Sequence, residues 1–396
     1  MTPAPEPAAS SENDPRADAG TPATNGAGVP PLAPWPLSSM PRAVVLLVGG
    51  VSAVGIVAGI RALAWLVGPV FLALIIVIAA HPVQRWLRDR GWPGWVATLA
   101  LLLVIYVGLL ALALVLLVSV GQLATVLPQY TAQFDALVAS VEHLLAGLGI
   151  GPAQIQAATS SANLGSIVGA LGGVLSGVSG VLAGVILVLA LLLFFIADAS
   201  TFGLRLDSIG AERPNVVRAL ESFARGTRSY LVVTTVFGLI VAVLDTIALE
   251  IMGVPLAVLW GVLAFITNYI PNVGFIFGLV PPALLALLTG GWQLLAIVIV
   301  VYSLLNLVIQ SLIQPRFVGN SVGLSATVTF VTLLFWAWVL GPLGALLAIP
   351  LTLLAKALLV DIDPRARWAD ALLRTNAAGP APAAAPAPAP ESRPLT

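Results

Sequence analysis

Long apolar runs alternate with short polar segments along most of this chain. Four runs lie at about 43–60, 62–80, 95–118 and 178–197, and a fifth extends from Tyr230 to Ile251. Each run is long enough to cross a hydrocarbon core of about 30 Å as a helix that rises about 1.5 Å per residue. The pattern predicts an all-α protein, built as a polytopic bundle of transmembrane helices.

Two further apolar segments are too long for a single crossing, and each is broken near its middle. Residues 254–288 would span about 52 Å as one helix, but Asn268–Gly274 interrupts them. Residues 324–359 repeat this design, with Gly341–Gly344 as the interruption. Proline removes a backbone donor and glycine permits non-helical dihedral angles, so both interruptions predict turns. With an ordinary span at about 292–313 between them, we expect two Gly/Pro-broken helical hairpins, each either re-entrant or a pair of short spans.

The segment between the third and fourth spans has a different pattern. Apolar residues recur from Leu127 to Leu148 in steps of three and four residues, which is typical of an amphipathic helix. We interpret it as an extracytoplasmic helix that lies on its own domain, with partner binding as the alternative. Glycines from Gly165 to Gly184 then form a small-residue face, which suits close helix packing within the chain or between subunits.

The two ends of the chain differ in composition from this core. Residues 1–40 are rich in Pro, Ala, Gly and acidic residues, and 376–396 form an Ala/Pro tract, so both ends are expected to be disordered. The predicted organisation is a disordered N-terminal tail (1–40), three spans (41–118), an extracytoplasmic helical segment (119–177), the fourth span (178–197), a cytoplasmic amphipathic segment (198–228), a core with broken helices (229–360) and a cytoplasmic, mostly disordered tail (361–396).

Composition indicates that the bilayer is the solvent of this protein, and it excludes several classes of function. With 59% hydrophobic and 9% charged residues and a mean hydropathy of +1.04, a water-soluble domain of 396 residues is excluded. The formal net charge of zero argues against a nucleic-acid partner. The chain has no cysteine, two histidines, no HExxH motif and no phosphate-binding GxxxxGKS/T loop. We therefore expect no metal site, no cofactor and no catalytic set of residues, and we do not expect an enzyme.

The basic residues occupy a few short segments. No lysine or arginine occurs between Arg90 and Arg205 or between Arg228 and Arg316. By the positive-inside rule the loop at residues 85–90 is cytoplasmic, which places both termini in the cytoplasm and the segment after the third span outside. Arg316 is also cytoplasmic if each broken segment enters the membrane and returns to the same side.

One acidic residue lies inside a predicted span. Asp245 belongs to the fifth span, and a charged side chain at the centre of a membrane helix costs about 2.5 to 3.5 kcal/mol on insertion scales. We interpret Asp245 as a coupling-ion candidate that relays a proton or holds a cation. The alternative is an interfacial position beside Glu250, where the carboxylate reaches water.

Uncharged polar residues gather around the first helix break. Asn268 and Asn272 flank it, and Asn306, Gln310 and Gln314 follow at spacings of four along one face of the next span. Such a stripe faces protein or a pathway, and a helix break leaves backbone groups that can bind a polar solute or an ion. Hydrogen-bonded helix packing is the alternative. The candidate substrate-binding residues are Asn268, Pro271, Asn272, Gly274, Asn306, Gln310 and Gln314, and the second hairpin turn consists of Gly341, Pro342 and Gly344.

Several short motifs resemble those of one family of bacterial membrane proteins. They are Gly68-Pro69 through His81-Pro82-Val83, Arg228-Ser229-Tyr230-Leu231, Gly253-Val254-Pro255, Tyr269 to Gly274, Gln314 to Gly319 with Val322-Gly323-Leu324, and Gly341 to Ala345 with Pro350. In this order and spacing, over about residues 42–360, the chain resembles the autoinducer-2 exporter family, also called the PerM-like permeases.

The resemblance implies an oligomeric inner-membrane permease of about eight membrane passes, with export of autoinducer-2 in some members and sodium/proton antiport in others. Many relatives carry an acidic residue shortly before the proline of Gln-Pro-Arg. The stretch NLVIQSLIQPR has none, so Asp245 is left as the titratable alternative.

Three functions remain open on the sequence alone. The first is a secondary transporter that exports a small polar solute across the bacterial inner membrane, with the solute near the helix breaks. The second is a monovalent cation (sodium)/proton antiporter that uses Asp245. The third is a non-transporting membrane scaffold that assembles through its external helix and glycine face. The expected partners are membrane lipid, a small polar solute or a monovalent cation, and further copies of the chain.

Overall fold

The computed structural model describes residues 41–148, 178–271, 273–314 and 324–363, together with three single positions, 154, 169 and 373. Residues up to Ala53 form one unit and residues from Val54 onward form another, to which the contacts below belong. Throughout the described part the chain is helical, so the predicted all-α, polytopic membrane class is confirmed. The predicted N-terminal tail, nearly all of the predicted C-terminal tail, part of the glycine face, and Pro315 and Arg316 lie outside the described residues.

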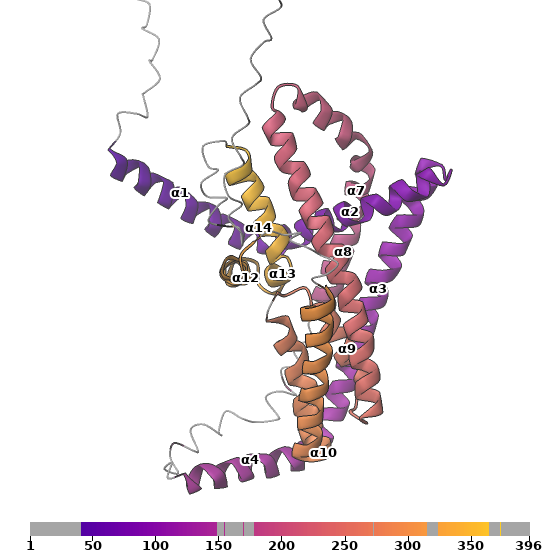
Figure 1. The fold of residues 1–396 in the computed structure, drawn as a ribbon, viewed down its shortest axis with the longest axis vertical. Helices are drawn as coiled ribbons and strands as arrows, with labels where there is room; N and C mark the ends of the chain where they lie inside the picture. The colour runs from indigo at the N-terminus through magenta and orange to yellow at the C-terminus, as the bar shows by residue number, and fades with distance from the viewer. Residues whose placement is uncertain are drawn as a thin grey trace, which may run out of the picture. The chain divides into compact units, whose positions relative to one another are not determined.

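The described helices follow the predicted order of spans (Figure 1). Their bounds are α1 Arg42–Ala62, α2 Ala64–Asp89, α3 Gly94–Val126, η2 Leu127–Tyr130, α4 Thr131–Gly147, α7 Val178–Gly210, α8 Pro214–Ile251, α9 Ala257–Thr267, α10 Gly274–Asn306, η3 Leu307–Ile313, α12 Ala326–Leu340, α13 Pro342–Leu346, α14 Ala348–Lys356 and η4 Ala357–Asp361. Among the described residues, five helical stretches are long and apolar enough to cross a membrane: Ala64–Asp89, Gly94–Gly147, Leu182–Ala199, Pro214–Ile251 and Gly274–Ile313. The figure of about eight passes stays a prediction.

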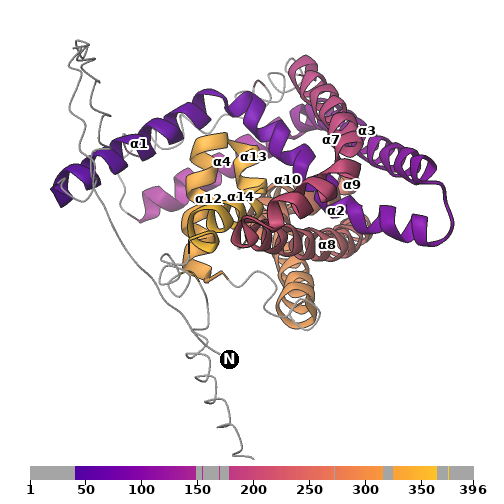
Figure 2. The same ribbon diagram turned by 90° about the horizontal axis from the view of Figure 1, so that it is seen from above.

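The long helix α8 packs against α9, α2 and α14, beside which it lies in both views (Figures 1 and 2). From Ala219 to Leu249 its buried residues recur every three or four positions. This spacing keeps them on one face of the helix, so a single stripe of α8 contacts the other helices along most of its length. Small residues such as Gly238 and Ala242 belong to that stripe and permit close helix approach.

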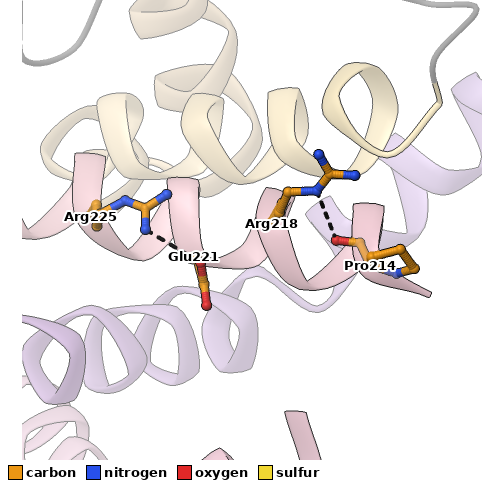
Figure 3. Close-up of polar contacts among 4 residues, drawn as sticks. All are labelled: Pro214, Arg218, Glu221 and Arg225. Carbon is orange, nitrogen blue, oxygen red and sulfur yellow. Dashed lines mark hydrogen bonds and ion pairs between the residues drawn. The ribbon is translucent and has the colours of Figure 1, made fainter. Parts of the chain in front are cut away.

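The amphipathic stretch at 198–228 is not a separate element. The helix α7 continues to Gly210 and α8 already begins at Pro214, so the two long helices supply this stretch and meet in the turn between them. Figure 3 shows the first turns of α8, where Arg225 forms an ion pair with Glu221 (3.4 Å) and Arg218 Nε donates to the Pro214 carbonyl oxygen (3.3 Å). These arginines therefore have partners on their own helix.

The amphipathic helix α4 carries no buried side chain. Leu144 is 67% exposed and Leu148 is 79% exposed. Leu123 and Tyr130, just before α4, make the apolar packing of this region against the rest of the chain. The expectation that this helix lies on its own domain is thus not met within the described residues, because no described helix covers its apolar stripe.

The first helix break has the predicted position, but its glycine, Gly274, has a different role from the predicted one. The turn connects α9 to α10 with hydrogen bonds from Ile270 N to the Thr267 carbonyl oxygen (2.8 Å) and from Gly274 N to the Ile270 carbonyl oxygen (3.0 Å). We expected Gly274 to supply a non-helical conformation, yet it lies in helical conformation at the start of α10. A Cβ atom at Gly274 would lie 1.8 Å from the Thr267 carbonyl oxygen, so glycine is required for the close approach of the two arms.

At the second break one glycine supplies a non-helical conformation and another permits a close backbone approach. Gly341 ends α12 with a φ of 69°, a left-handed conformation that favours glycine. Pro342 follows at the first position of α13, where a missing N–H costs no helical hydrogen bond. A Cβ atom at Gly344 would lie 1.9 Å from the Trp336 carbonyl oxygen, which repeats the close approach seen at Gly274.

The span predicted at about 292–313 is less regular than expected. It is separated from the first arm of α10 by a kink at Gly291, where φ is 70° and ψ is −164°. Its last seven residues, Leu307–Ile313, wind as a π-helix. Such turns are rare and often occur at functional sites.

The orientation of the chain can be tested with single cysteines, because the sequence contains none. Asp135 in α4 and Glu212 in the turn after α7 are exposed, and within the described part of the chain the candidate span Leu182–Ala199 lies between them. We expect Asp135→Cys to react with an impermeant maleimide on intact cells, and Glu212→Cys to react only after the membrane is opened, as the positive-inside rule requires. Reaction of both residues in intact cells would contradict the predicted topology.

Candidate functional site

Asp245 lies on the buried face of α8, which packs here against α9 and α10. Its side chain is 0% exposed, and neither carboxylate oxygen has a hydrogen-bond partner among the described residues. Glu250, further along the same helix, is exposed. Asp245 therefore lies in the protein interior and does not reach the surface as the interfacial alternative requires. Burying a charged carboxylate without a partner costs free energy. A bound proton, cation or water molecule is therefore needed to offset that cost.

A small cavity lies beside Asp245, where α8, the first helix break and η3 come together. Its size is on the scale of about one water molecule, so it has room for a water molecule or an ion of similar size but not for an organic solute. Its lining residues are Val241, Asp245, Ala264, Thr267, Asn268, Phe275, Gly278, Tyr302, Asn306 and Gln310.

Tyr302 is a lining residue that the sequence pattern did not single out. Its side chain is 1% exposed, and its hydroxyl group, like the Asp245 carboxyl group, is buried without a partner in the described chain. Tyr302 lies four residues before Asn306, which lies four before Gln310, so the polar stripe begins one turn earlier than expected. This spacing was the signal that could have identified it.

Asn268 joins three elements through its side-chain amide. Its Nδ2 atom donates to the Thr234 carbonyl oxygen on α8 (3.0 Å), and its Oδ1 atom accepts from Gln310 Nε2 in η3 (2.9 Å). Gln310 Nε2 also donates to Asn306 Oδ1 (2.6 Å), and Asn306 Nδ2 donates to the Tyr302 carbonyl oxygen (2.9 Å). The helix break is thereby connected to both neighbouring helices by one network of amides.

Two local features make this network possible. A Cβ atom at Gly238 would lie 2.6 Å from Asn268 Nδ2, so the glycine on α8 leaves room for the amide. The π-helical winding of η3 changes the register of the polar stripe, because its hydrogen bonds close five residues apart instead of four. Gln310 lines the cavity, whereas Gln314 beyond the π turn does not.

Two tyrosine hydroxyl groups, which do not line the cavity, also connect the first helix break to α8. Tyr230 donates from its hydroxyl to the Tyr269 carbonyl oxygen (2.8 Å), and the Tyr269 hydroxyl lies 2.6 Å from Thr235 Oγ1. Two motifs that are far apart in the sequence, the start of the fifth span and the break, are in contact here. These bonds hold the tip of the hairpin in place next to the cavity.

The structure brings together some of the predicted site residues and separates others. Asn268, Asn306, Gln310 and Asp245 line one cavity. Pro271 and Gly274 shape the turn without lining it, and Asn272 lies outside the described residues. Gly341, Pro342 and Gly344 belong to the second hairpin and contribute no lining residue. The cavity combines one carboxyl group with neutral amides and hydroxyls, a set that can hydrogen-bond a polar solute or bind a proton or cation.

Comparison with known proteins identifies the relatives of this chain. The family model described as AI-2E family transporter matches residues 51–362. The chain is 31% identical over 302 residues to the AI-2 transport protein TqsA of Escherichia coli strain K12, which covers 76% of this chain and 87% of that protein. It is 30% identical over 308 residues to the putative transport protein YhhT of the same strain, covering 77% and 87% of the two chains. A putative transport protein of Haemophilus influenzae is 30% identical over 329 residues, covering 82% and 94%.

Proposed function

The chain belongs to the AI-2E family of transporters, and we propose that it is a secondary transporter of a small polar solute in the bacterial inner membrane. Family membership confirms the resemblance seen in the motifs and establishes a membrane transport protein. The observation that supports the solute site is the position of Asn268, which lies at a helix break and is hydrogen-bonded to both neighbouring helices. Broken helices of this kind hold the substrate in other secondary transporters.

The described conformation is closed to solute. The cavity has room for about one water molecule, so an organic solute enters only when the hairpin tip separates from α8 and η3. The bonds that have to open are those from Asn268 to Thr234 and from Gln310 to Asn268. The freed amides then hydrogen-bond the solute, an exchange of similar bonds that changes the free energy little.

A small polyol-like signal molecule fits this chemistry, because amides and hydroxyls bind such groups without charge. The relative TqsA is named an AI-2 transport protein, and we propose AI-2 as the first solute to test. Membrane lipid is the surrounding partner. Assembly into homo-oligomers and cytoplasmic positions of both termini are further parts of the proposal.

Monovalent cation/proton antiport is the second candidate function, and Asp245 is the observation that favours it. The unpartnered carboxyl group and the water-sized cavity suit a bare ion or a proton better than a solute. The scaffold alternative gains no support, because the family is one of transporters.

The amide network provides a test in proteoliposomes. We expect Gln310→Leu to lower AI-2 counterflow at least tenfold, because leucine has no amide to hydrogen-bond the solute after the site opens, and each such bond contributes about 1 kcal/mol. Gln129→Leu, which changes an exposed glutamine outside the cavity, is the matched control and should transport as the wild type does. Sodium and proton fluxes are measured in the same vesicles. Wild-type counterflow by Gln310→Leu would exclude the amide site, and ion exchange without AI-2 movement would favour the antiporter.

A further inference from the structure

The crossing of α2 and α8 contains an arginine whose position is explained by a proline. Pro82 lies inside α2 and has no N–H, so the carbonyl oxygen of Ile78, four residues earlier, loses its helical donor. Arg228 Nε on α8 donates to that oxygen (3.3 Å). The proline thus creates an acceptor, and the acceptor holds the guanidinium group against α2. Its two terminal nitrogens remain available for another partner.

Further basic side chains continue from this point along α2. Arg85 lies seven residues after Ile78, near the face that Arg228 contacts, and Arg88 follows three residues later with its guanidinium group beside Gly94 at the start of α3. Arg85 is near enough to Arg228 for the two charges to repel each other. We call Arg85, Arg88 and Arg228 the α2–α8 basic cluster.

No carboxylate of the described chain neutralises this cluster. The ion pairs found there are Arg225 with Glu221 and Lys356 with Asp361, and neither involves the cluster. By contrast, Arg218 and Arg225 on the same helix have the local partners that Figure 3 shows. Arg228 is half-buried, and charges removed from water are normally paired. The cluster therefore requires an anion from outside the described chain.

The surroundings of the cluster indicate where that anion comes from. Three tryptophans at the end of α2 and the start of α3 are exposed: Trp86 by 51%, Trp92 by 45% and Trp95 by 72%. Exposed tryptophans next to arginines at the end of an apolar span are typical of the membrane–water interface. This is the depth at which the phosphate groups of phospholipids lie.

We propose that the α2–α8 basic cluster binds the phosphate group of an anionic phospholipid and that this lipid connects α2 to α8. Basic sites between transmembrane helices at this depth bind acidic headgroups, and each arginine near the surface adds to the attraction. Arg228 provides a fixed pair of donors, and the exposed Arg85 and Arg88 complete the site.

The test measures lipid binding by the full-length protein in detergent with native mass spectrometry. The probes are dioleoylphosphatidylglycerol, dioleoylphosphatidylcholine and inorganic phosphate. We expect Arg85→Gln/Arg228→Gln to bind phosphatidylglycerol at least tenfold more weakly than the wild type, with phosphatidylcholine weak throughout. The matched control is Arg218→Gln/Arg225→Gln, which removes the same charge from exposed positions of α8 and should bind as the wild type does.

Other outcomes overturn the proposal. If both double variants lose phosphatidylglycerol binding equally, the lipid is attracted by the net charge of the protein and not by a specific site. If Arg85→Gln/Arg228→Gln binds phosphatidylglycerol as the wild type does, the site is excluded. Displacement of the lipid by an equal concentration of inorganic phosphate would assign the cluster to a free anion. Arg85→Gln/Arg88→Gln changes two exposed side chains and leaves the bond to Ile78 intact, so it serves if the first variant does not fold, and it has to show the same loss.

Discussion

Replacing Asp245 by asparagine should abolish ion-coupled transport and leave the folded protein at least as stable as the wild type. The amide has almost the same shape, but it neither takes up a proton nor carries the charge that holds a cation. The native carboxyl group is fully buried and has no hydrogen-bond partner in the described chain, so the substitution breaks no bond there. Ion-driven accumulation in proteoliposomes should fall to the level of empty vesicles, and the melting temperature should not decrease.

This pair of measurements separates coupling from structure. Asp198→Asn makes the same chemical change at an exposed position of α7 and should leave both measurements unchanged. A structural role for Asp245 would show itself as a lower melting temperature together with lost transport. If the variant still exchanges ions with an unchanged pH profile, Asp245 does not couple ion movement to transport. Solute counterflow without accumulation in the variant would identify Asp245 as the coupling residue of a solute transporter.

Replacing Gly274 by alanine should disrupt the first hairpin and stop transport. The added Cβ atom would meet the carbonyl oxygen of Thr267 at 1.8 Å and its carbonyl carbon at 2.7 Å. Both atoms belong to the backbone of the opposite arm, so no side-chain rotation relieves the clash and the arms have to separate. Overpacking of this kind costs about 1 to 3 kcal/mol or more, and it displaces Asn268 from the amide network. The expected result is a lower melting temperature and loss of counterflow.

The control for this prediction is Gly108→Ala in α3. Nothing lies within 4 Å of a Cβ atom at Gly108, so the change should be neutral or slightly stabilising, because alanine is the better helix former. Pro271→Ala in addition to Gly274→Ala favours a continuous helix across the break. Wild-type transport by that double variant would show that the break is only a packing feature, and the solute site would then lie elsewhere.

The sequence by itself determined the class of the protein and the positions of its main breaks. An apolar run of about 20 residues has few stable alternatives to a spanning helix, because hydrocarbon leaves backbone groups no partner outside the helix. Proline and glycine act locally as well, so the interruptions at Asn268–Gly274 and Gly341–Gly344 could be predicted from residue type. The polar stripe of Asn306 and Gln310 was also predicted, since side chains four residues apart share a helix face.

Only the tertiary structure decided which of these residues meet. Asn268 and Gln310 are distant in sequence, and their hydrogen bond depends on how the hairpin tip packs against α8 and on the π turn in η3. The burial of Asp245 beside Tyr302 likewise comes from packing between α8 and α10, because the period of an apolar helix does not show which side faces protein and which faces lipid. Gly274 is the clearest case. Its residue type was readable in the sequence, but its role follows from the opposite arm, whose carbonyl oxygen occupies the place of a side chain.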